Sequence, residues 1–343
     1  MSGGAELERF RRHFPLPQVG RKGQARLAEA TVAVVGCGAT GGAVAEFLIR
    51  AGVGNLRAID RDVVAFDNLH RQILFDESDA AEGRPKALAA MRALQAVNGA
   101  ARIEGLAQNL DRTNFEMLLG QADLIVDGTD NIPTRYLINH YAVARGVPWI
   151  YLGVAGTEAA WMPILPGRGP CLRCVFPEPP PPGSLPTCDS VGVLGPVPAA
   201  AAAAVAVLAL RILLGDPPVP RLATWDYWRG EGRSLRPLRR VECRACGPEA
   251  DPDPPGLEPR VVELCGRGMH QIVPRSTDSL DLGRLARTLE SVCEPGSLRS
   301  GAGVVQCRVD TIRLVVFPDG RALVEGAANE DEALAIFDRY IGS

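Results

Sequence analysis

Four of the nine cysteines occur as two C-x-x-C pairs, Cys171 with Cys174 and Cys243 with Cys246. Four thiolates complete a tetrahedral Zn²⁺ site and leave no open position, so such a metal would be structural. Because the pairs lie far apart in sequence, they would clamp two segments together rather than form an autonomous zinc finger. The alternative is two thioredoxin-like redox pairs, but neither is expected at the start of a helix in a compact βαβ unit. The spacing therefore favours zinc.

A glycine-rich sequence, Gly36-x-Gly38-x-x-Gly41, lies between an apolar run at 31–35 and an amphipathic helix predicted for 42–51. Glycines there permit a tight turn and let backbone N–H groups approach a phosphate at the helix N-terminus. Asp60 ends the next predicted strand, where a carboxylate can hydrogen-bond a ribose hydroxyl. This pattern alone fits an NAD-dependent oxidoreductase as well as it fits an ATP site.

Further polar residues follow the ribose position: Asn68, Arg71 and Gln72, and then Lys86 at the start of a predicted helix. Arg and Lys neutralise a triphosphate, Arg through its planar fork and Lys as a point charge. A hydride-transfer enzyme has no need of this positive charge. The competing interpretation of Arg71 or Lys86 alone is a solvated surface charge.

Asp130 and Asn131 follow a short apolar strand predicted for 123–126. Ligands of open α/β sheets collect beyond the strand ends, and Mg²⁺ on phosphate oxygens takes one or two carboxylates, so Asp130 is the predicted magnesium ligand. The alternative is that Asp130 or Asn131 caps the helix that begins near residue 132. The two residues can also divide these tasks.

The elements that must position these residues alternate along the chain. Strands are predicted at 31–35, 55–60, 102–106, 123–126 and 148–152, with helices at 42–51, 86–97 and 132–145. Such alternation predicts the α/β class, with a doubly wound, mostly parallel, Rossmann-like sheet. Prolines dominate 176–186, which predicts an extended or mobile crossover loop.

Four segments are expected. Residues 1–30 would form an N-terminal helical arm, 31–246 the nucleotide domain with the cysteine pairs, and 247–259 a proline-rich linker. Residues 260–343 read as a small C-terminal α+β domain, with short strands near 261–264, 271–273, 304–307, 312–317 and 322–325 and helices near 281–292 and 329–341.

Composition limits the partners. Lys+Arg number 37 and Asp+Glu 40, a net charge of −3, so general nucleic-acid binding is not expected. The most apolar stretch, 199–214, is shorter than a bilayer requires and contains Arg211, so it is predicted to be a buried helix. The charged N-terminus has no apolar signal region. Together with cysteines spaced for a metal, this predicts a cytoplasmic protein that does not span a membrane.

Several motifs in this order resemble the ubiquitin-activating-like (ThiF/MoeB/HesA) family, the bacterial adenylyltransferases of molybdopterin and thiamine biosynthesis. The motifs are G-C-G-A-T-G at 36–41, D-R-D at 60–62, N-L-H-R-Q at 68–72, D-G-T-D-N at 127–131, P-C-L-R-C at 170–174, C-D-S-V-G-V-L-G-P at 188–196 and C-R-A-C at 243–246. The resemblance covers about residues 8–246.

The resemblance implies ATP-dependent adenylylation of the C-terminal glycine carboxylate of a small ubiquitin-like sulfur-carrier protein. It implies that Gly36, Gly38, Gly41 and Asp60 contact the nucleotide, that Asn68, Arg71, Gln72 and Lys86 cradle the phosphates, and that Asp130 and Asn131 lie at the magnesium. Arg12 would reach the active site of the other subunit of a homodimer, and Cys188 would form a covalent intermediate with the carrier. A cysteine desulfurase or a rhodanese would supply the sulfur.

The sequence also departs from the family pattern. Ala39 and Thr40 replace loop glycines, His13 replaces a Gln, and Asp67 replaces a Ser. Two alternatives stay open: an NAD-dependent Rossmann oxidoreductase, and a catalytically inactive zinc-stapled binding relative. For Arg12 the alternative is a solvated charge, and for Cys188 an incidental loop cysteine.

Overall fold

The computed structural model describes residues 8–180, 188–251, 261–264, 268–274, 280–301 and 303–342. The chain divides into two compact units, Met1–Gly256 and Leu257–Ser343.

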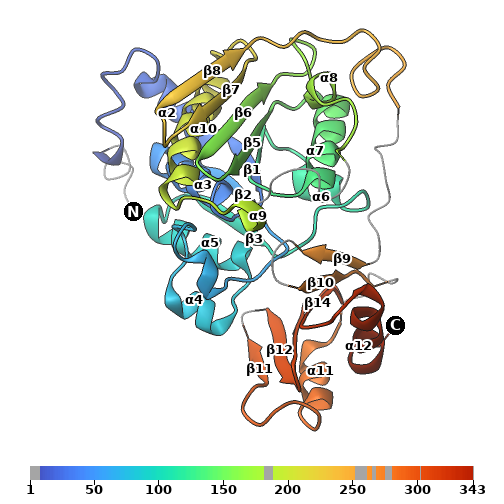
Figure 1. The fold of residues 1–343 in the computed structure, drawn as a ribbon. Helices are drawn as coiled ribbons and strands as arrows, with labels where there is room; N and C mark the ends of the chain where they lie inside the picture. Colours follow the sequence, from blue (N-terminus) through green and yellow to red (C-terminus); the bar gives the residue numbers. More distant parts are fainter. Residues whose placement is uncertain are drawn as a thin grey trace. The chain divides into compact units, whose positions relative to one another are not determined.

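An eight-stranded sheet forms the centre of the first unit, in the order β3-β2-β1-β4-β5-β6-β7-β8 (Figure 1). The first five strands in this order are parallel: β1 (Thr31–Val35), β2 (Asn55–Ile59), β3 (Arg102–Leu106), β4 (Leu124–Asp127) and β5 (Trp149–Ala155). They confirm the predicted doubly wound, mostly parallel sheet. Three antiparallel strands that the sequence did not predict extend it: β6 (Glu158–Ile164), β7 (Leu222–Asp226) and β8 (Glu231–Leu235).

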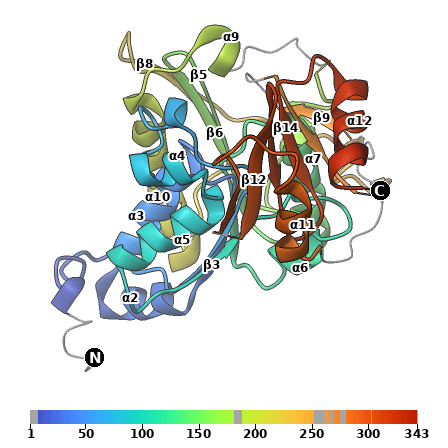
Figure 2. The same ribbon diagram turned by 90° about the horizontal axis from the view of Figure 1, so that it is seen from below.

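Helices cover both faces of this sheet, as Figures 1 and 2 show. One layer contains α2 (Gly20–Glu29), α3 (Gly41–Ala51), α5 (Lys86–Val97) and α10 (Pro196–Leu214), and the other α6 (Phe115–Leu119), α7 (Ile132–Arg145) and α8 (Leu172–Val175). Alternate side chains of β1 pack against the two helix layers, because successive side chains of a strand point to opposite faces of the sheet. Val32 and Val34 belong to the core under α3, while Ala33 and Val35 belong to the core under α7. Burial on both faces explains why β1 is apolar throughout.

Helix α10 is buried against α3, β5 and β6. Among the described residues it is the one helix long and apolar enough to cross a membrane. Its alanines Ala201, Ala202 and Ala206 are buried and permit close packing, whereas Val207 on the outer side is 57% exposed. The predicted buried helix is therefore present, but one side of it is exposed among the described residues of the first unit.

Shorter elements connect the layers. The 3₁₀ helix η1 (Phe66–Asn68) and α4 (Glu77–Glu82) lie between β2 and α5, and α9 (Cys188–Val191) precedes α10. Residues 181–187 are outside the described residues, so most of the predicted crossover loop is not described.

The second unit is a six-stranded antiparallel sheet with two helices. Its order is β11-β12-β13-β14-β10-β9, from β9 (Val261–Leu264), β10 (Met269–Ile272), β11 (Arg299–Gly301), β12 (Val304–Val309), β13 (Ile312–Val316) and β14 (Ala322–Glu325). The core of this unit includes Leu285 and Leu289 of α11 (Leu282–Leu289) and Phe337 of α12 (Glu330–Tyr340). This is the predicted α+β domain, with α11 ending at Leu289, earlier than the predicted residue 292.

Candidate active site and metal centre

The carboxyl ends of β1 and β4 form the point at which the chain leaves the sheet toward opposite layers, α3 after β1 and α7 after β4. Such a switch point opens a crevice in doubly wound sheets. Three glycines hold its two loops together. A Cβ atom added to Gly128 would lie 2.5 Å from the Gly36 carbonyl oxygen, and one added to Gly41 only 1.9 Å from it. Close packing therefore requires glycine at all three positions, and at Gly36 the φ of +82° requires it as well.

Gly38 differs from the other loop glycines because an added Cβ would meet only the Gln72 side chain, 3.6 Å away. Among the hydrogen bonds between described residues, none is donated by the backbone N–H of Gly38, Ala39 or Thr40. Thr40 is the N-cap of α3, and its side chain accepts no capping hydrogen bond. Free N–H groups at a helix N-terminus form an anion site. The loop therefore fits an anion, and its contact with a phosphate stays a prediction.

Asp60 ties β2 to this loop. Its carboxylate accepts hydrogen bonds from the N–H of Cys37 at 2.7 Å and of Asp62 at 2.8 Å. Burial raises the pKa of Asp60, although the charge of Lys86 and these N–H groups act to lower it. Each carboxylate oxygen has a second lone pair, so contact with a ribose remains a prediction for Asp60.

Asn68, Arg71 and Gln72 lie in or just after η1, and their side chains differ in the hydrogen bonds that they make within the chain. Asn68 is 1% exposed, and its side chain accepts the Ala65 N–H and donates to Asp67, so it shapes the turn. The Arg71 guanidinium donates to the Asp67 carbonyl at 2.6 Å. The Gln72 side-chain oxygen is buried without a hydrogen-bond partner among the described residues. Since buried polar atoms are nearly always paired, Gln72 beside Gly38 marks a place for a ligand.

Lys86 begins α5 and is 8% exposed. Its Nζ atom lies 2.5 Å from Oδ2 of Asp62, a partner that the sequence analysis did not assign to the site. Lys86 is one of two lysines in a chain whose other basic residues are arginines, Lys22 being the second. The surface-charge interpretation of Lys86 is wrong, because the residue is buried.

Two carboxylates follow β4, and they differ sharply. Asp127 is fully buried, accepts hydrogen bonds from the N–H and hydroxyl of Thr129, and pairs with Arg135 of α7 at 3.2 Å. Burial raises the pKa of Asp127 despite the opposing charge of Arg135. Asp130 is exposed. Asn131 is the N-cap of α7 and accepts the Thr134 N–H at 2.9 Å, so the predicted division between a free carboxylate and a cap is present.

The chain after the crossover returns to this edge of the sheet. Gly156, in the turn after β5, exchanges backbone hydrogen bonds with Gly192 and Leu194 at 2.9 and 3.0 Å. A Cβ atom on Gly195 would lie 2.6 Å from the carbonyl oxygen of His70, the neighbour of Arg71. Helix α9, which begins at Cys188, contacts β5. The backbone of the Cys188 segment therefore lies near the predicted nucleotide loops, while its side chain lies outside the described residues.

The two C-x-x-C pairs converge on one cluster. The four sulfur atoms of Cys171, Cys174, Cys243 and Cys246 lie within 4.8 Å of one another, with separations of 3.9, 3.5 and 3.5 Å between Cys171–Cys174, Cys171–Cys243 and Cys174–Cys246. A tetrahedral ion with metal–sulfur bonds of about 2.3 Å requires sulfur separations of roughly 3.8 Å. The cluster therefore fits a metal ion.

The surroundings act differently on the thiols of the cluster: burial raises the pKa of Cys171, and it raises that of Cys246 to about 11. Burial acts to raise the pKa of Cys243, but the N–H groups of Ala245 and Cys246 lower it to about 7. Cys171 is the N-cap of the four-residue helix α8, but the flanking strands β6 and β7 are antiparallel, so this helix is not part of a βαβ unit. Because both pairs meet in one place, the arrangement is that of a metal clamp rather than of two separate redox pairs.

Arg12 is exposed and makes no hydrogen bond or ion pair within the part of the chain that the structure describes. The neighbouring Phe10 packs on Gly52 at the C-terminal end of α3, where an added Cβ would lie 2.9 Å from the ring. The glycine loop lies at the other end of this 11-residue helix, about 16 Å away at 1.5 Å per residue. The arm therefore lies away from the crevice of its own chain.

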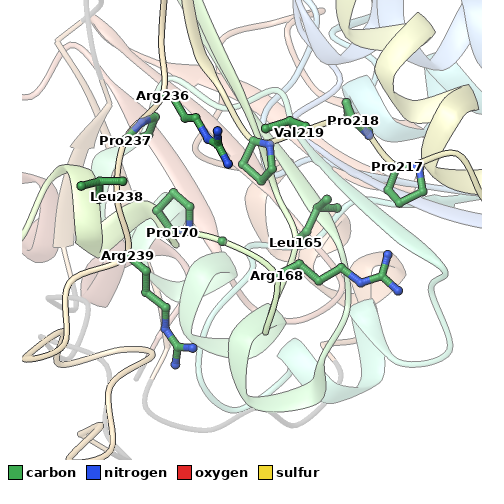
Figure 3. A pocket seen from close by; sticks show the side chains of 12 residues that line it. Leu165, Arg168, Pro170, Pro217, Pro218, Val219, Arg236, Pro237, Leu238 and Arg239 are labelled. Atoms are coloured by element: carbon green, nitrogen blue, oxygen red, sulfur yellow. The ribbon is translucent and has the colours of Figure 1, made fainter.

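A cavity of about 360 Å³ lies near the metal cluster rather than at the crevice (Figure 3). Its walls include Pro170, Pro220 and Leu238, and the guanidinium groups of Arg168 and Arg239 point away from its centre. The segments that line it join the strands at the end of the sheet opposite to Gly36 and Gly128. It offers neither a glycine loop nor a carboxylate, so it is not the nucleotide site.

Comparison with known proteins agrees with this geometry. The sequence profile of the ThiF family matches residues 10–245. The chain belongs to the ThiF family. This ThiF-family chain is 35% identical over 342 residues to the sulfur carrier protein ThiS adenylyltransferase of Bacillus subtilis (strain 168), which covers 97% of the chain and 99% of that relative. It is 42% identical over 251 residues to a sulfur carrier protein adenylyltransferase of Thermus thermophilus, covering 71% of the chain and 92% of the relative.

Among solved structures, the ThiF-family chain resembles E. coli MccB with MccA-N7isoASN. The TM-score is 0.59 at 25% identity, over 65% of this chain and 69% of the other. Family membership and the names of the relatives make the chain an enzyme of the adenylyltransferase class. The oxidoreductase alternative thereby loses its basis, because the glycine loop was its only support.

Proposed function

We propose that this protein catalyses ATP-dependent adenylylation of the C-terminal glycine carboxylate of a small ubiquitin-like sulfur-carrier protein. The proposal rests mainly on one observation: groups that could bind phosphate and groups that could bind a metal ion lie at the same crevice. The unused N–H groups of Gly38–Thr40, the unpaired oxygen of Gln72 and the exposed Asp130 belong to loops at the carboxyl edge of the parallel strands. The buried Lys86 begins α5 at the same edge. The sulfur-carrier adenylyltransferases among the relatives support the substrate class.

In this proposal the loop of Gly36, Gly38 and Gly41 receives phosphate oxygens, and Asp60 receives the ribose. Lys86, Arg71, Asn68 and Gln72 surround the remaining phosphates. Asp130 would hold Mg²⁺, a hard cation that prefers oxygen ligands and would neutralise phosphate charge. Asn131 contributes less directly, because its side-chain oxygen already caps α7.

The reaction needs no strong base, since a C-terminal carboxylate is ionised near neutral pH. A carboxylate oxygen attacks the α-phosphorus of ATP and forms a mixed carboxylic–phosphoric anhydride. The bond between the α-phosphorus and the bridging oxygen breaks, and pyrophosphate leaves with that electron pair. Lys86 and Arg71 stabilise the charge that develops on the phosphates, so catalysis consists of positioning and electrostatic stabilisation.

The acyl-adenylate then transfers its acyl group to sulfur. We assign Cys188 as the residue that captures it: a thiolate attacks the carbonyl carbon, AMP leaves, and a thioester forms. The contacts of Gly192 and Leu194 with the turn after β5 support this assignment, because they hold the Cys188 segment at the same edge of the sheet. A cysteine desulfurase or a rhodanese is the proposed sulfur donor.

We propose zinc as the ion of the four-cysteine cluster, since tetrahedral thiolate sites select Zn²⁺. Reduced thiols are required for it, which favours the cytoplasm as the compartment.

A homodimer completes the proposal. The exposed side of α10, with Val207 and the alanine Ala203, is an apolar surface suited to a second copy of the chain. Because Arg12 lies beyond the far end of α3, it would act on the crevice of the partner subunit. Mixing Arg12→Ala subunits with Asp130→Asn subunits should then restore activity. In the mixed dimer, the crevice of the Arg12→Ala subunit keeps its own Asp130 and receives Arg12 from the other subunit.

An ATP–pyrophosphate exchange assay tests the central reaction. We expect exchange that requires Mg²⁺ and a sulfur carrier, and that disappears when the same carrier lacks its terminal glycine. Asp130→Asn should abolish it, whereas Asp216→Asn, an exposed carboxylate beyond α10, should not change it. Exchange that is independent of the carrier, or its absence with every sulfur carrier, would contradict the proposal.

A further inference from the structure

Arg135 joins three parts of the crevice through one buried guanidinium. It lies in the first turns of α7 and is 9% exposed. Its Nε donates to Asp127 at 3.2 Å, and its Nη2 donates to the carbonyl oxygens of Thr129 at 2.6 Å and Leu152 at 3.3 Å. The guanidinium also lies over the ring of Tyr151, 5.0 Å from its centroid. Thus one side chain connects α7, the loop after β4 and strand β5.

Asp127 binds the same loop through hydrogen bonds from Thr129. Its Oδ1 accepts the Thr129 N–H at 2.9 Å and the Thr129 hydroxyl at 2.7 Å, while its Oδ2 accepts from Arg135. The preceding residue, Gly128, is fixed by its contacts with Gly36 and Gly41. Every residue from Asp127 to Thr129 is therefore held in place, and Asp130 is the next residue and the first with an exposed side chain.

Stability alone does not account for this pair. Burying two charges has a large desolvation cost, and an apolar pair of similar volume is often as stable. Besides its pair with Asp127, Arg135 donates to the Thr129 carbonyl, in the loop that carries Asp130, and to the Leu152 carbonyl of β5. A charged fork with several donors fixes a backbone in a way that apolar packing does not.

We propose that Arg135 is a positioning residue for the adenylylation reaction: with Asp127 it holds the Thr129–Asp130 segment so that the Asp130 carboxylate meets the magnesium of Mg·ATP. The guanidinium is buried and donates to Asp127, Thr129 and Leu152, so Arg135 acts through the loop and is not assigned as a catalytic residue. The inference rests on the proposed function for the identity of the reaction, but it also predicts a property of nucleotide binding that needs no carrier.

The test uses Arg135→Lys, which keeps the charge but loses the fork to Thr129 and Leu152. Binding of a fluorescent ATP analogue is measured by titration, once in EDTA and once over a range of free Mg²⁺. In EDTA, we expect Arg135→Lys to bind the ATP analogue with an affinity within about twofold of wild type. Mg²⁺ should increase the affinity of both proteins, but Arg135→Lys should need a roughly tenfold higher Mg²⁺ concentration to reach half of this increase. Arg145→Lys, at the other end of α7 in an exposed pair with Glu116, is the matched control and should behave as wild type.

A double-mutant cycle with Asp130→Asn separates positioning from a general effect on folding. Because both substitutions disable the same contact, Arg135→Lys should change magnesium-dependent binding less than about twofold in the Asp130→Asn background. Effects that multiply, or equal losses with and without Mg²⁺, would overturn the proposal. If wild type shows no carrier-dependent exchange, the proposed function fails, whereas the magnesium-dependent binding still decides the role of Arg135.

Discussion

The ammonium of Lys86 lies 2.5 Å from the carboxylate of Asp62, so the first residue of α5 is joined to the loop that follows β2. The backbone N–H of Lys86 donates to the carbonyl oxygen of Asp62 as well, at 2.9 Å. This double connection fixes Lys86 at the edge of the crevice before any nucleotide binds. A preorganised charge stabilises a reaction without reorganisation at the moment of reaction.

Lys86→Met is expected to lower the rate of ATP–pyrophosphate exchange about 100- to 1,000-fold, because one stabilising charge is lost. Lys86→Arg should restore little of it, since the planar guanidinium is larger than the nearly buried ammonium. Lys22→Met, at an exposed position in α2, is the control and should keep the wild-type rate. A wild-type rate of ATP–pyrophosphate exchange by Lys86→Met would show that Lys86 does not contribute to catalysis.

Gly128→Ala and Gly38→Ala should differ, although both are glycines of the crevice. An added methyl on Gly128 meets backbone atoms at 2.5 Å, so we expect a loss of unfolding free energy of about 1–3 kcal/mol. At Gly38 the nearest atom is the Gln72 side chain at 3.6 Å, so the fold should be retained while ATP affinity falls. Thermal unfolding and ATP titration of both variants measure this difference. If Gly128→Ala unfolded at the same temperature as Gly38→Ala, the loops of Gly36 and Gly128 would be able to move apart to accommodate the methyl group.

Metal content tests the cysteine cluster. Elemental analysis of purified protein should find one zinc per chain, and Cys243→Ser should lose it together with thermal stability, since a site that lacks one thiolate binds the metal less tightly. Cys293→Ala, at a half-buried cysteine of the second unit, should retain the metal. A Cys243→Ser protein with full zinc content would show that the ion lies elsewhere.

Tyr136 predicts a loss of stability at alkaline pH. Its hydroxyl donates to the Phe176 carbonyl at 2.9 Å, and burial raises its pKa from 10.0 to about 12. Because the folded state favours the neutral phenol, this stabilisation is complete below pH 10 and is lost as the pH rises to about 12. Urea unfolding at pH 8, 10 and 11 should therefore show a steeper decline for wild type than for Tyr136→Phe. Parallel declines would assign the alkaline sensitivity to other groups.

Local sequence determined much of this protein. The apolar run of β1, the glycine loop and the alternation of strands and helices predicted the parallel sheet and one end of its crevice, because burial on both faces and tight turns leave direct marks on residue type. The pairing of cysteines at metal-ligand spacing likewise predicted the cluster. Strand β8 left no such mark: its five residues are exposed, and only its hydrogen bonds to β7 make it a strand.

Tertiary structure decided how these parts act together. Its position beyond the end of β4 predicted Asp130 as the free carboxylate, and Asp130 is exposed. The sequence did not predict the role of the second carboxylate, Asp127, which is buried and pairs with Arg135 of α7. The same applies to Lys86, whose partner comes from another element. Contacts between distant segments depend on how the layers pack, so a pattern along the chain cannot determine them.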